Sequence, residues 1–146
     1  MIVYVDASAL VKRYVAEVGS ADLNALTMDA AAVATSLVTR AEIAAALARA
    51  VRVGVLDDVN GRRAQRRFSR EWPDLMRVPV TETLVARAEA LAWAHGLRGY
   101  DAVQLASALT WQDALGQETV LATFDRQLWE GALQAGLRVW PDRLPI

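Results

Sequence analysis

Ile2-Val3-Tyr4-Val5-Asp6-Ala7-Ser8-Ala9-Leu10 is the stretch that decides the fold. Its four leading apolar residues, two of them valine, are typical of a strand buried on both faces. Asp6 ends that strand, and the small and hydroxyl residues after it are typical of a helix start. Because ligands of an open α/β sheet bind beyond the carboxyl ends of its strands, this stretch predicts a central strand with Asp6 at the functional edge.

The rest of the chain continues this alternation of strands and helices. Patterns of hydrophobicity and stop signals predict strands at 1–5, 31–37, 77–80, 120–124 and 138–140. They predict helices at 9–17, 20–30, 39–53, 58–72, 81–95, 100–115 and 127–135. Strands that alternate with helices imply right-handed crossovers and helices on both faces of the sheet. We therefore expect one α/β domain over residues 1–146, a three-layer α/β/α sandwich with a mainly parallel central sheet.

Composition excludes several classes of protein. The chain has 146 residues, of which 54% are hydrophobic, so it can bury a core without disulfides or a structural metal. It has no cysteine, which excludes thiolate chemistry and fits a reducing cytoplasm. No apolar run approaches the ~20 residues of a membrane span, and no signal-peptide pattern is present. With a net charge of −1, any nucleic-acid binding must come from locally sorted charge.

Four acidic residues are predicted at one edge of the sheet. Asp6 and Asp125 end two strands, whereas Glu42 and Asp101 fall in the first turns of two helices. If the four converge, their repulsion is severe unless cations neutralise it. Hard oxygen ligands with no cysteine or histidine nearby suit Mg²⁺ or Mn²⁺ and not zinc. The pattern therefore predicts a carboxylate cage for divalent cations.

Taken singly, each acidic residue also has an ordinary structural interpretation. Asp6 and Asp125 can cap the helices that follow them. Glu42 and Asp101 each lie in the first turn of a predicted helix, where a negative charge complements the helix dipole. Capping alone explains the set of four at matching positions poorly.

The motifs around these residues resemble those of PIN domains. The opening stretch resembles the family's first strand, which ends in aspartate before a small residue and a Ser or Thr. Thr39-Arg40-Ala41-Glu42 is similar to the motif around the family's glutamate, and Arg98-Gly99-Tyr100-Asp101-Ala102-Val103-Gln104-Leu105-Ala106 to its most recognisable segment. Leu121-Ala122-Thr123-Phe124-Asp125-Arg126-Gln127-Leu128 is similar to its last acidic motif.

This resemblance implies a PIN-like α/β/α sandwich that cleaves RNA with Mg²⁺ or Mn²⁺ held by Asp6, Glu42, Asp101 and Asp125. It implies that Ser8 and Thr123 orient carboxylates or water. The size resembles the VapC toxin branch, which implies an endoribonuclease toxin that forms a homodimer and is neutralised by a small antitoxin protein. Local turn and cap bonding is the alternative role for the two hydroxyl residues.

A basic stripe lies in the predicted helix at 58–72. Five arginines fall within an arc of about 140° on one helix face, namely Arg62, Arg63, Arg66, Arg67 and Arg70. Arg49 lies on the same helix face as Glu42, seven residues after it. We expect these arginines to contact RNA phosphate or an antitoxin, and a solvated face is the alternative. The Asn60-Gly61 pair could also interrupt this helix.

Two other functions compete with the ribonuclease interpretation. A haloacid-dehalogenase-type phosphohydrolase also begins with a strand that ends in aspartate, but it uses a second aspartate where this chain has Ser8. A PIN-like module that binds RNA or protein without catalysis is the other alternative. The complete acidic set argues against such a module, because unused clustered carboxylates destabilise a fold.

Overall fold

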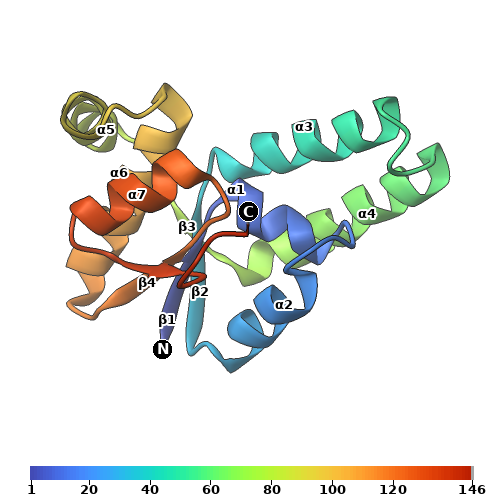
Figure 1. The fold of residues 1–146 in the computed structure, drawn as a ribbon, viewed down its shortest axis with the longest axis horizontal. Coiled ribbons are helices and arrows are strands. Elements are labelled where there is room, and N and C mark those ends of the chain that lie inside the picture. The colour runs from blue at the N-terminus through green and yellow to red at the C-terminus, as the bar shows by residue number, and fades with distance from the viewer. Residues whose placement is uncertain (146) are drawn as a thin grey trace.

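The sheet of the computed structural model, which describes residues 1–145, is five-stranded and parallel throughout (Figure 1). Its strand order is β3-β2-β1-β4-β5. The strands are β1 (Ile2–Val5), β2 (Ala32–Ser36), β3 (Met76–Val78), β4 (Thr119–Ala122) and β5 (Arg138–Trp140). The apolar strand β1 lies at the centre, and Tyr4 is in register with Ala34 of β2 and Leu121 of β4. The prediction of a parallel sheet around β1 is confirmed.

The helices are α1 (Ala7–Leu10), α2 (Ser20–Asp29), α3 (Thr39–Arg52), α4 (Asp58–Glu71), α5 (Glu82–His95), α6 (Gly99–Leu115) and α7 (Arg126–Gln134), with 3₁₀ turns η1 (Val11–Arg13) and η2 (Trp72–Asp74). The predicted helix at 9–17 was wrong in extent, because regular helix ends at Leu10 and the 3₁₀ turn ends at Arg13. The chain turns there, which buries Val15 and lets Lys12 Nζ donate to the Val18 carbonyl at 2.8 Å.

Alternation along β1 assigns the helices to the two faces of the sheet. Val3 and Val5 pack in a core cluster with residues of α1, α2, α3 and α4. Tyr4 points to the other face, where its cluster includes residues of α5, α6 and α7. Helices therefore cover both faces, as the three-layer prediction requires (Figure 1).

Helices α3 and α4 form a hairpin that extends to one side of the sheet (Figure 1). The Asn60-Gly61 pair does not interrupt α4, so that alternative was wrong. Gly61 is buried where α4 crosses α3, and a Cβ there would collide with the Val51 side chain. The glycine is thus explained by the close approach of two helices. Within residues 1–145, no helix is long and apolar enough to cross a membrane.

Candidate carboxylate site

The four predicted acidic residues line one open pocket at the carboxyl edge of the sheet. Asp6 follows β1, Asp125 follows the neighbouring strand β4, and Glu42 lies in the first turn of α3. Asp101 lies in the first turn of α6, whose N-terminus reaches the same edge. The pocket has a volume of about 310 Å³ and is lined by Asp6, Ser8, Glu42, Arg98, Tyr100, Asp101 and Asp125. Segments that are far apart in the sequence thus bring the predicted carboxylates together.

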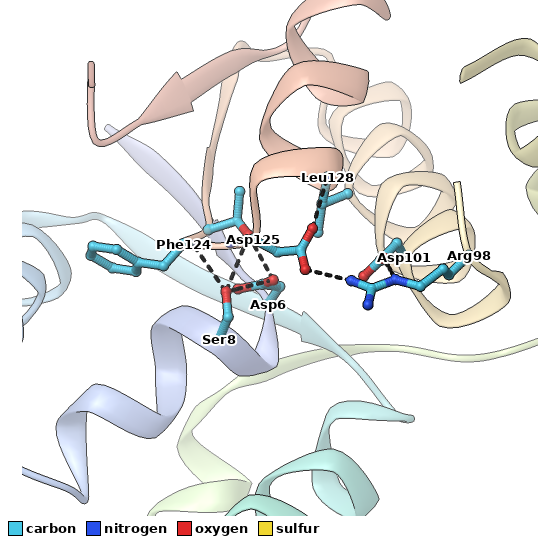
Figure 2. A network of polar contacts seen from close by, with 8 residues as sticks. Asp6, Ser8, Arg98, Asp101, Phe124, Asp125 and Leu128 are labelled. Atoms are coloured by element: carbon cyan, nitrogen blue, oxygen red, sulfur yellow. Dashed lines mark hydrogen bonds and ion pairs between the residues drawn. The ribbon is translucent and has the colours of Figure 1, made fainter. Parts of the chain in front are cut away.

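Asp6 is the most buried of the four, with 4% of its surface exposed. Ser8 Oγ donates to its carboxylate at 2.8 Å (Figure 2). Thr123 Oγ1 donates to the same carboxylate at 2.7 Å, and the Ala9 amide donates at 2.9 Å. Burial nevertheless raises the pKa of Asp6 to about 7, because desolvation outweighs these hydrogen bonds. Without a cation, this carboxyl therefore holds a proton more tightly than an exposed aspartate does.

The two hydroxyl residues also tie the ends of β1 and β4 together. Ser8 Oγ accepts from the Phe124 amide at 2.9 Å, and Thr123 Oγ1 accepts from the Asp125 amide at 3.1 Å. Each hydroxyl can thus hold the Asp6 carboxylate and the backbone after β4 at once. Both are local contacts of the kind expected in turns, and both also aim Asp6 at the pocket.

Glu42 is held by a chain of buried polar side chains. Gln104 Nε2 donates to Glu42 Oε1 at 2.7 Å and to Thr39 Oγ1 at 2.9 Å. Gln104 Oε1 accepts from the Tyr4 hydroxyl at 2.5 Å. Desolvation raises the pKa of Glu42, and the charge on Asp101 adds to that rise. The network therefore links the central strand to the first turn of α3.

Arg98 forms ion pairs with the other two carboxylates. Its Nε lies 2.9 Å from Asp101 Oδ2, and its Nη2 lies 2.6 Å from Asp125 Oδ2 (Figure 2). Desolvation and the charge on Asp125 raise the pKa of Asp101, although Arg98 opposes that rise. Within residues 1–145, no three acidic, histidine or cysteine side chains are close enough to share one ion. The four carboxylates line a common pocket, in which Arg98 pairs with Asp101 and Asp125 while Gln104 donates to Glu42.

The structural interpretations of two aspartates also hold. Asp6 caps α1 by accepting from the Ala9 amide, and Asp125 caps α7 by accepting from the Leu128 amide at 3.0 Å. Capping fixes where these carboxylates lie, so it is part of how the pocket is built. Capping and a place in the pocket are therefore compatible.

None of the six arginines expected to contact RNA or an antitoxin lines this pocket. All six are exposed, and they are Arg49, Arg62, Arg63, Arg66, Arg67 and Arg70. The opposite face of α4 buries Ala64 and Phe68, as predicted. Arg67 pairs with Glu71 and Arg62 with Asp58, whereas the other three in α4 form no ion pair with the part of the chain described.

Sequence reasoning did not assign roles to Arg98 and Gln104. Each lies three residues from Asp101, one before and one after, so the helical period places both near it. Gln104 is also a polar residue in an apolar stretch of α6, and it is only 2% exposed. A buried glutamine needs hydrogen-bond partners for its amide. A lone glutamine in an apolar stretch is therefore the sequence feature that could have identified Gln104.

Comparison with known proteins agrees with this geometry. The model of the PIN domain family matches residues 3–131, and the chain belongs to that family. Ribonuclease VapC45 of Mycobacterium tuberculosis (strain CDC 1551 / Oshkosh) is 42% identical over 98% of this chain and 97% of its own length. That relative is evidence for the VapC-type branch, as the resemblance implied. The haloacid-dehalogenase-type alternative gains no support.

Solved structures show the same fold. The FitAB complex bound to an IR36 DNA fragment contains a chain with a TM-score of 0.72 and 17% identity, covering 99% of both chains. A toxin–antitoxin complex from Klebsiella pneumoniae gives a TM-score of 0.66 at 17% identity, covering 99% of this chain and 100% of the other. At this identity the likeness concerns the fold alone.

Proposed function

We propose that this chain is an endoribonuclease that depends on Mg²⁺ or Mn²⁺ and acts in the cytoplasm as the toxin of a toxin–antitoxin pair. The observation that carries the proposal is the meeting of four carboxylates from four chain segments in one pocket. Burial of Asp6 disfavours its charged form, and a cation would offset that cost. Membership of the PIN family and the 42% identity to a VapC ribonuclease support the same activity.

In this proposal Asp6, Glu42, Asp101 and Asp125 would hold one or two cations. When bound, the cation would lower the pKa of a water molecule and neutralise charge on the scissile phosphate. Ser8 and Thr123 orient Asp6 through the hydrogen bonds they donate to it. Gln104 orients Glu42 in the same way.

The proposed partners are an RNA substrate, a small antitoxin protein and a second copy of this chain in a homodimer. The acidic pocket cannot attract RNA by its own charge, so phosphate must be met elsewhere on the surface. We assign that contact, or the contact with the antitoxin, to Arg49 and the arginines of α4. The fold is proposed to act as a single domain.

A cleavage assay on RNA tests this proposal. We expect wild-type activity to vanish in EDTA and to return with Mg²⁺ or Mn²⁺, and Asp101→Asn to be inactive at every cation concentration. Asp113→Asn is the matched control, because Asp113 lies on the same helix and pairs with Arg87 outside the pocket. Full activity of Asp101→Asn, or activity unaffected by EDTA, would contradict the proposal. RNA binding without cleavage in any cation would instead favour a non-catalytic binding module.

A further inference from the structure

Arg98 is the basic residue among those that line the carboxylate pocket in the described chain. Its guanidinium bridges Asp101, in the first turn of α6, and Asp125, which follows β4 (Figure 2). Two nitrogens of one planar group thus neutralise two carboxylates that repel each other. The protein therefore supplies its own cation to half of the acidic set.

The oxygens of Asp125 show what this bridge occupies. Oδ1 accepts from the Leu128 amide and caps α7, and Oδ2 accepts from Arg98 Nη2. Both oxygens therefore accept a hydrogen bond, and each keeps a second lone pair. A divalent cation that approaches Oδ2 meets the positive charge of a guanidinium nitrogen 2.6 Å from that oxygen. The guanidinium and the cation thus compete for the negative charge of Asp125.

Release of Arg98 requires no repacking of the core. Its side chain is 67% exposed, whereas that of Asp125 is 24% exposed. The guanidinium can therefore leave the carboxylates for water by rotation of its own side chain, and an exposed ion pair resists such exchange weakly. Its two partners stay in place because helix α6 and the cap of α7 hold them.

We propose that Arg98 is an intramolecular counter-ion that occupies the Asp101–Asp125 pair until a divalent cation displaces it. Arg98 then sets the cation concentration at which the pocket loads. The inference rests on the proposed function, because it takes the same pocket as the cation site. It goes further because it assigns the Arg98 guanidinium as the group that occupies the metal-free pocket.

The test is a titration of the full chain with Mn²⁺ alone. Binding is measured by calorimetry and by the electron paramagnetic resonance signal of free Mn²⁺. Removing the competitor in Arg98→Gln should tighten the Kd for Mn²⁺ by about tenfold. Arg126→Gln is the matched control. Arg126 is 63% exposed, follows Asp125 directly, and pairs with Glu130 at 3.9 Å instead. Its removal takes the same charge from the neighbourhood and should change the Kd by less than about twofold.

Two further measurements separate competition from loss of structure. In EDTA, Arg98→Gln should have a lower Tm than wild type, because Asp101 and Asp125 then repel without compensation, and saturating Mn²⁺ should remove the difference. Arg98→Lys keeps the charge but cannot bridge with two planar donors. Its Kd for Mn²⁺ should lie between those of wild type and Arg98→Gln.

Equal Kd values for Arg98→Gln and Arg126→Gln would overturn the inference, as would weaker Mn²⁺ binding in both Arg98 variants. If Arg98→Gln does not fold, an Arg98→Lys Kd equal to that of wild type would overturn it. Failure of the proposed function looks different, because wild type would then bind Mn²⁺ no better than Asp101→Asn does.

Discussion

Asp6 combines a buried position with a charge that the proposed function needs. The folded chain holds the Asp6 proton with a pKa of about 7, against an ordinary value of 3.8 in the unfolded chain. The folded state therefore binds more protons than the unfolded state between these values. The contribution of Asp6 to stability is complete below pH 4 and is lost as the pH rises through 7. In metal-free protein we expect this loss to reach at most about 4 kcal/mol.

Urea unfolding in EDTA at several pH values measures this effect. Asp6→Asn should lose less stability between pH 4 and pH 7 than wild type does, whereas the exposed control Asp22→Asn should behave like wild type. Saturating Mg²⁺ should flatten the wild-type profile near pH 7, because the cation replaces the proton. A pH dependence that is identical in Asp6→Asn and wild type would show that Asp6 does not hold this proton.

Gln104 provides a second test at the scale of single residues. Gln104→Met removes the donor to Glu42 and leaves the buried Tyr4 hydroxyl without its acceptor, which should cost about 1–3 kcal/mol of stability. Adding Tyr4→Phe removes the orphaned hydroxyl, so the double variant should regain part of that stability. Cleavage should stay impaired in the double variant, because Glu42 still lacks its donor. If stability and cleavage recover together, Gln104 is a structural residue and does not position Glu42.

At the scale of elements, α4 carries a charge pattern that its packing does not use. Its buried side is Gly61, Ala64 and Phe68, while Arg63, Arg66 and Arg70 project into solvent. Helix α4 then leads through η2 into the amino end of β3, so Arg70 lies towards the edge of the sheet opposite the carboxylates. None of these arginines lines the carboxylate pocket, so we expect an RNA contact by the stripe to contribute to binding and not to chemistry.

Replacing Arg63, Arg66 and Arg70 with Gln should weaken RNA binding without changing turnover at saturating RNA. Each lost phosphate contact should flatten the salt dependence of log affinity by about 0.7, or about 2 for three contacts. The control replaces Arg77, Arg138 and Arg143 with Gln, which removes the same charge elsewhere on the surface. If RNA binding is unchanged but affinity for the antitoxin falls, the stripe contacts the protein partner. If neither affinity responds, the stripe is only a solvated face.

At the scale of the whole molecule, the pocket joins segments from both halves of the chain. A cation held there as proposed would contact the loop after β1, α3, α6 and the loop after β4, so it should stabilise the whole fold by mass action. We expect Mg²⁺ or Mn²⁺ to raise the Tm of wild type by an amount that grows with cation concentration. The shift should be absent in Asp6→Asn/Asp101→Asn. An equal shift in that double variant would put the cation elsewhere.

The sequence by itself determined the order of strands and helices and the edge at which the acidic residues lie. The run before Asp6 is apolar enough to be a central strand, and parallel strands must present their carboxyl ends together. The first helix predicted from local sequence was too long. The turn after Arg13 depends on burial of Val15 and not on local helix propensity.

Only the tertiary structure decided which side chains hold the carboxylates. Tyr4 meets Gln104 across 100 positions of sequence, and Asp6 meets Thr123 across 117. Arg98 reaches Asp125 only because the start of α6 is packed beside the end of β4. Hydrophobic periodicity specifies which face of an element is buried, but it carries no information about contacts between polar groups of distant segments. Those contacts follow from packing, and they set the charge and the geometry of this pocket.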